Sequence, residues 1–157
     1  MTLRVRDRQV RGIGRDRARA WQVWGPAWLG MLALAFANGT ARAVGYQPVI
    51  GETAARQIAT ASLIALLGGY VWVLHRRAPL PDRVTAFAVG GAWTLLTLGF
   101  EFGFGHYVQL MPWEALLADY DVTSGRVWVL VPIATLVMPA LVRTVQAGRG
   151  ALGNRTS

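Results

Sequence analysis

Six side chains that can bind ions or protons lie near the ends of long apolar segments in this sequence. They are Asn38, Arg42, Arg56, Glu101, His106 and Arg126. Arginine binds carboxylate and phosphate groups through paired hydrogen bonds, and a glutamate in an apolar setting pairs with a cation or takes up a proton. We therefore predict a binding site for a small anionic or polar ligand. The three arginines would supply charge, and Glu101 would act as their partner or as a protonatable group.

Helical geometry brings these residues to one level. If each apolar segment is a helix that starts at the arginines of its other end, then at 1.5 Å per residue Asn38, Arg56 and Glu101 lie about 27–30 Å along their helices. Arg42 follows Asn38 by one turn, and Arg126 opens the last apolar segment. We expect all of them in one plane, near the outer edge of the hydrocarbon of a membrane.

Composition places the chain among membrane proteins. Hydrophobic residues make up 54% and charged residues 15% of the 157 residues, and the charges crowd between long uncharged stretches. The net charge of +8 would suggest nucleic acid in a soluble protein, but here every basic residue is an arginine and most flank apolar segments. No basic face with stacking groups is organised, so nucleic acid is not expected as a partner.

The fold class predicted from these segments is an all-α membrane protein. Four transmembrane helices are expected in an up-down bundle: residues 20–41, 56–75, a third beginning at residue 84, and 126–142. A short interfacial helix is expected between the third and fourth, because apolar residues in 113–120 recur at helical spacing over too short a length to span. Ala41-Arg42-Ala43 also has the form of a signal-peptide cleavage motif, but the apolar region before it is long, and we keep it as a span.

The distribution of arginines predicts the orientation. Thirteen lie in the N-terminal segment, the middle loop and the C-terminal segment, and three lie on the other side. By the positive-inside rule both termini are expected in the cytoplasm. The expected organisation is an Arg-rich cytoplasmic tail (1–20), a transmembrane domain (21–147) and a second cytoplasmic tail (148–157), with the tails disordered or, for the first, lying on the membrane surface.

Small and polar residues mark two helix faces. On the third span they are Gly90, Thr94, Thr97, Glu101 and Gly105, and we expect this face to point away from lipid into the bundle. On the second span they are Gln57, Ala61, Ala65 and Gly69, a stripe that predicts close helix packing.

Several functions stay open at this stage. The polar cluster could be a set of interfacial salt bridges that clamp the bundle, with Glu101 paired to Arg42 or Arg126, as in a structural or accessory subunit. It could also relay protons through Glu101 and His106, or belong to a membrane-embedded enzyme that acts on a lipid headgroup. A transporter would need to form a homodimer, because four helices enclose a narrow path. The possible ligands are then an anionic small molecule or a lipid headgroup.

No cofactor and no metal are expected. The two histidines fall at opposite faces of the membrane, which disfavours a haem held between them. The segment 119–125 resembles a calcium loop, but its glycine is one place late and Leu130 stands where a glutamate belongs. No motif of a hydrolase, a P-loop or a zinc protease is present.

Several short stretches carry a resemblance to known sequences. They are Asn38-Gly39-Thr40-Ala41-Arg42, Ala55-Arg56-Gln57, Phe100-Glu101, Gly105-His106-Tyr107-Val108, and the stretch from Trp113 through Asp119-Tyr120-Asp121 to Gly125-Arg126-Val127-Trp128. The chain resembles a group of small four-span bacterial integral membrane proteins that have no assigned activity. The resemblance covers about residues 25–145. It implies a four-helix membrane fold and a multi-pass location in the bacterial cytoplasmic (inner) membrane, but no substrate.

Overall fold

Four long helices dominate the structure, a computed structural model that describes the backbone of residues 2–153 and the side chains of residues 12–148. They are α1 (Thr2–Thr40), α3 (Glu52–Arg77), α4 (Arg83–Gly103) and α6 (Leu130–Gly153). Five short elements join them: η1 (Ala41–Tyr46), α2 (Gln47–Ile50), η2 (Phe104–Val108), α5 (Trp113–Ala118) and η3 (Val122–Ser124). No strand occurs in the described residues, as the all-α prediction requires.

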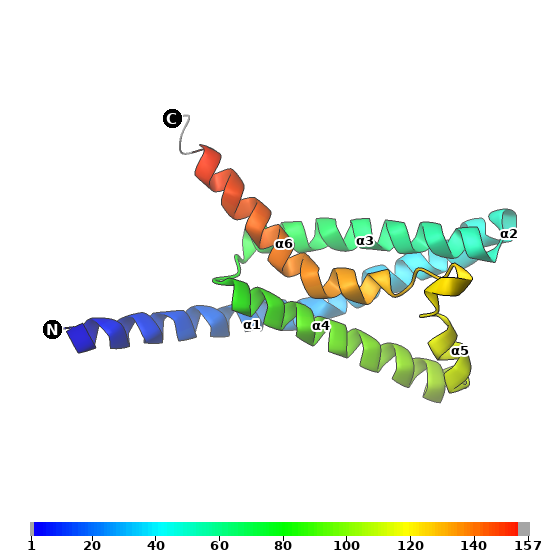
Figure 1. Ribbon diagram of the computed structural model, residues 1–157, viewed down its shortest axis with the longest axis horizontal. Coiled ribbons are helices and arrows are strands. Elements are labelled where there is room, and N and C mark those ends of the chain that lie inside the picture. Colours follow the sequence, from blue (N-terminus) through cyan, green and yellow to red (C-terminus); the bar gives the residue numbers. More distant parts are fainter. Residues whose placement is uncertain (1, 154–157) are drawn as a thin grey trace.

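The long helices lie side by side. Both α1 and α6 pack against α3 and against α4. The start of α1, the end of α6 and the turn between α3 and α4 lie at one end of the molecule, and α2 and α5 lie at the other (Figure 1). We call these the terminal end and the α5 end. The six predicted site residues all belong to elements that reach the α5 end.

Three helices in the described part of the chain are long and apolar enough to cross a membrane. They are Glu52–Arg77, Arg83–Val108 and Leu130–Gly148. α1 is not among them, although residues 20–41 carry no charge. Tryptophans, Pro26 and Asn38 make this segment less apolar than the other three. The prediction of membrane helices is therefore confirmed for three segments, and a crossing by α1 stays a prediction.

α1 is held to the other helices by polar side chains that bind backbone carbonyls. Trp24 is fully buried, and its Nε1 donates to the carbonyl oxygen of Ala78 at 2.9 Å. Trp93 of α4 donates to the carbonyl oxygen of Trp24 at 2.9 Å, and Tyr70 of α3 donates to that of Ala27 at 2.8 Å. We call these three rings, Trp24, Tyr70 and Trp93, the aromatic core. Its indole and phenol donors are all satisfied, as burial of aromatic residues requires.

The small and polar face of α4 points inward, as predicted. Gly90 is buried, and a Cβ there would collide with the carbonyl oxygen of Leu136 on α6, so glycine sets the close approach of these two helices. Thr94 donates to the carbonyl oxygens of Gly90 and of Pro132. The corresponding prediction for α3 is wrong. Its stripe of small residues is exposed, and its buried face instead carries Ala55, Ala59, Leu63, Leu67 and Val71.

The exposed surface of the three candidate spans is apolar. Exposed large side chains include Leu66 on α3, Leu95 on α4 and Leu141 on α6, at 46%, 72% and 54%. A soluble protein would bury many of these, whereas lipid solvates them without cost. This surface is consistent with a membrane environment.

The terminal segments and the last span differ from expectation. Residues 2–19 continue α1 as helix instead of being disordered, and α6 runs on to Gly153; residues 154–157 of the predicted C-terminal tail lie outside the described residues. α6 begins at Leu130, four residues later than predicted, so Arg126 lies in the connection that precedes it. The short helix expected between the third and fourth spans is present as α5, and its position at a membrane interface stays a prediction.

Candidate functional site

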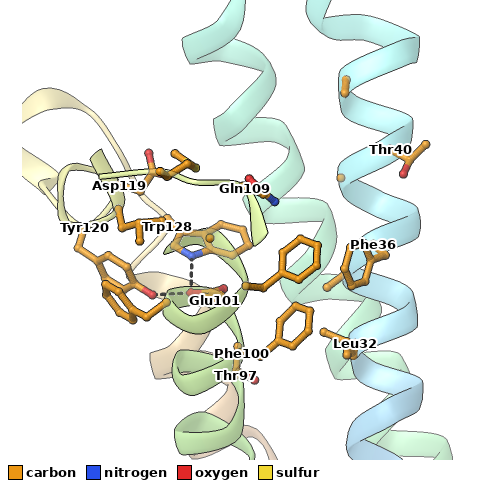
Figure 2. A pocket seen from close by; sticks show the side chains of 18 residues that line it. Leu32, Phe36, Thr40, Thr97, Phe100, Glu101, Gln109, Asp119, Tyr120 and Trp128 are labelled. Carbon is orange, nitrogen blue, oxygen red and sulfur yellow. Dashed lines mark hydrogen bonds between the residues drawn. The ribbon is translucent and has the colours of Figure 1, made fainter. Parts of the chain in front are cut away.

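A cavity of about 450 Å³ at the α5 end is lined by α1, α4, η2 and the connection that includes α5. Leu32 and Phe36 of α1 line it together with Phe100 of α4, and Glu101 lies in its wall (Figure 2). Gln109, Asp119, Tyr120 and Trp128 close it from the segment between α4 and α6. We call it the Glu101 cavity. Of the six predicted site residues, Glu101 alone lines it.

Glu101 is bonded by two neutral donors. Its Oε2 accepts a hydrogen bond from the hydroxyl of Tyr120 at 2.5 Å and another from Nε1 of Trp128 at 3.2 Å (Figure 2). Burial and the adjacent carboxylate raise the pKa of Tyr120 above its ordinary value of 10.0, so the phenol keeps its proton and stays a donor. Among the described residues no arginine or histidine forms an ion pair with Glu101. The expected pairing with Arg42 or Arg126 is therefore absent from the structure.

Three phenylalanines form the wall opposite the carboxylate. Phe100 and Phe104 are one helical turn apart and stack at 5.2 Å between ring centroids. Phe36 of α1 meets both rings edge to face, at 5.8 and 6.2 Å. Phe36 is 51% exposed, although its neighbours are aromatic. The cavity is therefore mostly apolar and aromatic, with its polar groups concentrated at Glu101 and at the rim formed by Asp119 and Gln109.

The chain reaches this arrangement by turning back after α4. The helix continues through η2 to Val108 and stops at Leu110, which has a left-handed φ of 56°. Pro112 then precedes α5, and Asp121 accepts from the backbone N–H of Thr123 to form the turn that follows. Gly125, with a φ of 78°, directs the chain back toward α6. These turns bring Tyr120 and Trp128, eight residues apart, onto the same carboxylate oxygen.

Asp119, next to Tyr120, joins two of the predicted arginines. Its Oδ1 lies 2.8 Å from Nη1 of Arg56 and 3.1 Å from Nη1 of Arg126. Arg56 also pairs with Glu52 at 2.8 Å, one turn earlier on α3. This group, which we call the Asp119 ion cluster, ties α3 to the connection between α5 and α6. Arg56 and Arg126, predicted at one level, therefore lie close together and share Asp119 as their partner, while the level of this group in a membrane stays a prediction.

The other predicted residues have separate roles. Asn38 donates to the carbonyl oxygen of Ala59 at 2.8 Å and accepts from Ser62, so it links α1 to α3. Arg42 forms no ion pair within the described residues, and its buried Nε has no hydrogen-bond partner there. Nδ1 of His106 lies 3.0 Å from the carbonyl oxygen of Met111, and its ring stacks on Trp113 at 4.1 Å. No contact joins His106 to Glu101 in the described structure, which leaves the proton relay without support.

The sequence prediction missed the residues that complete the cavity. The sequence places Tyr120 on the apolar face of a short helix and Trp128 within the predicted last span, two residues after its start at Arg126. Neither could be found from helical depth, because both lie in a connection whose path depends on turns. The aromatic residues on two helices, Phe36 and Phe100, were visible in the sequence, but nothing in their spacing distinguishes a cavity wall from a packed core.

Comparisons of the chain with protein-family models, with curated proteins and with solved structures find no match. Any functional assignment therefore depends on the geometry and charge of the Glu101 cavity and of the other sites in the fold.

Proposed function

We propose that this protein is an integral membrane protein of the bacterial cytoplasmic membrane, with four spans and both termini in the cytoplasm. Its proposed role is to bind a small amphiphilic cation in the Glu101 cavity, as a carrier or receptor. Three apolar helices and the arginine distribution support the location. Since both ends of the described chain lie at the same end of the molecule, a crossing by α1 is consistent with the arrangement (Figure 1).

The charge of the cavity carries this proposal. The Asp119 ion cluster contains two arginines and two carboxylates, so it is neutral by itself (2 − 2 = 0). Glu101 is left with only the neutral donors Tyr120 and Trp128. An ionised carboxylate in an apolar wall is costly without a cation, so a cationic ligand or a proton completes the site. A sequence count of arginines favoured an anion, but no arginine lines the cavity.

The aromatic walls suit the apolar part of such a ligand and its charge. The faces of phenylalanine, tyrosine and tryptophan rings attract ammonium groups, most strongly where water is excluded. A volume of about 450 Å³ falls within the range of small-molecule sites, which are mainly apolar with a few placed polar groups. An amine with an aromatic or short alkyl body would place its charge at Glu101 and its body against Phe36 and Phe100.

Ligands that differ in charge but little in shape test the proposal. The purified protein in detergent should be stabilised against thermal unfolding by benzyltrimethylammonium, but not by its neutral carbon isostere neopentylbenzene or by benzenesulfonate. Equal stabilisation by the neutral compound would show that only apolar contact matters. Stabilisation by benzenesulfonate instead would restore the anion site that the arginines predicted and overturn the proposal.

A variant that fills the cavity provides a second test. Gly39 lines the cavity, and a Cβ added there meets nothing within 4 Å, so Gly39→Leu should occupy the space without displacing backbone. Gly69→Leu is the matched control, because Gly69 is equally open but lies on the exposed face of α3. Gly39→Leu should abolish the response to benzyltrimethylammonium, and Gly69→Leu should keep it. Loss in both variants, or in neither, contradicts binding in this cavity.

The Asp119 ion cluster supports a second candidate function, a structural subunit in which the polar groups only clamp the helices. It joins α3 to the segment before α6 through three charged side chains: Arg56, Asp119 and Arg126. A purely structural role predicts that no ligand in the panel shifts the unfolding temperature. It also predicts that substitutions at Asp119 and at Glu101 affect stability alike.

A further inference from the structure

A second cavity, of about 370 Å³, lies at the terminal end, between the last turn of α3, the connection to α4, and α6. Its lining includes His75, Arg76, Leu80, Arg143 and Gln146. We call it the terminal-end cavity. It lies at the opposite end of α3 from the Asp119 ion cluster, and the function proposed for the Glu101 cavity makes no use of it.

The positive charge of the terminal-end cavity is not compensated. Arg143 donates from Nε to the carbonyl oxygen of Leu80 at 3.2 Å and from Nη2 to that of Pro81 at 3.1 Å. These bonds fix the guanidinium but cancel none of its charge. In the described part of the chain no carboxylate pairs with Arg143 or with Arg76, and Asp82, on the same connection, is already paired with Arg17. A fixed guanidinium beside a second arginine is the usual setting for a phosphate group.

The buried histidine adds an unused polar atom. His75 is 6% exposed, and its ring meets Trp24 edge to face at 6.3 Å. Gln146 donates from Nε2 to the carbonyl oxygen of Trp72, which turns its Oε1 toward Nδ1 of His75 at 3.3 Å. Nδ1 is then the protonated nitrogen, and Nε2, which has no hydrogen-bond partner in the described structure, is an acceptor. Buried polar atoms are nearly always bonded, so Nε2 marks a place where a hydroxyl group next to the phosphate of a ligand can donate a hydrogen bond.

From this geometry we infer that the terminal-end cavity binds a phosphate group through Arg76 and Arg143, with His75 at its inner wall. The cavity lies where α3 leaves its apolar segment, at the level where the headgroups of a membrane lie. Basic pockets between helices on the cytoplasmic side of membranes suit the headgroups of anionic lipids. The phosphate can therefore come from an anionic phospholipid or from a free phosphate in the cytoplasm.

Titration with lipid tests this site. The thermal unfolding temperature of the full-length protein in dodecyl maltoside should rise with added phosphatidylglycerol. It should not rise with phosphatidylcholine of the same acyl chains. The Arg76 side chain has no hydrogen bonds in the described structure, so Arg76→Gln removes none. This variant should raise the concentration of phosphatidylglycerol that gives half of the maximal shift in unfolding temperature by about five- to tenfold. Arg77→Gln is the control, because Arg77 is the adjacent exposed arginine and does not line the cavity. It should leave the half-saturating concentration unchanged.

If Arg76→Gln and Arg77→Gln weaken the binding of phosphatidylglycerol equally, general surface charge attracts the lipid. That result would overturn the proposed site. Equal stabilisation by the two lipids would do the same. Arg143→Gln should weaken binding as Arg76→Gln does; if this variant does not fold, the comparison of Arg76 with Arg77 decides alone. Inorganic phosphate identifies the source: a shift with phosphate alone assigns the site to a free phosphate, and a shift only with lipid assigns it to a headgroup.

Discussion

The aromatic core and the Glu101 cavity contain the same residue types, which have different roles in the two regions. In the aromatic core, Trp24 and Trp93 are fully buried at 5.6 Å from each other, and their indole N–H groups donate to backbone carbonyls. In the Glu101 cavity, the phenylalanine rings border empty volume, and the donors of Tyr120 and Trp128 converge on one carboxylate. Aromatic residues whose rings cover each other and whose donors meet the backbone serve packing. Those that surround a charge and a void are available to a ligand.

The two regions also differ in how much the helices depend on them. The aromatic core joins α1, α3 and α4 through three side chain to backbone bonds. The Glu101 cavity is lined by α1, α4 and the connection between α4 and α6. Near it, Asn38 links α1 to α3, and the Asp119 ion cluster links α3 to that connection. Substitutions in the first region should therefore change stability, and substitutions in the second should change binding.

The largest expected effect is at the aromatic core. Trp93→Ala removes a side chain that is 1% exposed and leaves a cavity, so the free energy of unfolding should fall by roughly 3–5 kcal/mol. Thermal or denaturant unfolding in detergent measures the loss. Trp21→Ala is the control, because Trp21 is 38% exposed and should cost much less. A small loss for Trp93 would contradict the structural role given to this region.

Sequence patterns predicted the helices well and the site only in part. Uncharged stretches, prolines and arginine runs located α3, α4 and α6, because a helix that crosses a membrane needs about 20 predominantly apolar residues. Helical rise also placed Arg56, Glu101 and Arg126 at the same end of the molecule, and Arg56 and Arg126 do meet at Asp119. Periodicity could not choose their partners. That choice depends on the turns at Leu110 and Gly125, which have no periodic signal.

The start of α4 offers a prediction with a pH dependence. Asp82 caps α4 by accepting from the N–H of Thr85, and this bond, followed by that from Arg17, lowers the pKa of its carboxyl below the ordinary value of 3.8. Asp82→Ala should cost about 0.5–2 kcal/mol of stability at neutral pH. Since the pKa is lower in the folded state, this contribution is present above about pH 4 and is lost as the pH falls through the folded pKa.

Unfolding of the wild type and of Asp82→Ala from pH 6 downward measures this dependence. The difference between their free energies of unfolding should stay constant down to about pH 4 and then shrink. A difference that grows on acidification would have the wrong sign for a capping carboxylate. Asp16→Ala serves as the control, because Asp16 is exposed and forms no ion pair in the described structure.

The smallest expected effects separate the two polar groups of the α5 end. Asp119→Asn weakens two ion pairs at a partly exposed site and should cost about 1 kcal/mol, less at high salt. Glu101→Gln keeps an oxygen that accepts from Tyr120 and Trp128, so its effect on stability should stay within about 0.5 kcal/mol. Unfolding at low and high salt compares them. A loss of stability at Glu101 as large as that at Asp119, or larger, would favour the clamp over the binding site.

The affinity of wild type and of Glu101→Gln for benzyltrimethylammonium, measured by equilibrium dialysis, tests the central claim most directly. If Glu101 is the counter-ion of a bound cation, the substitution should raise the dissociation constant at least about tenfold while the folded protein stays intact. Equal dissociation constants in the two proteins would contradict the account, because the charge of Glu101 would then have no part in binding.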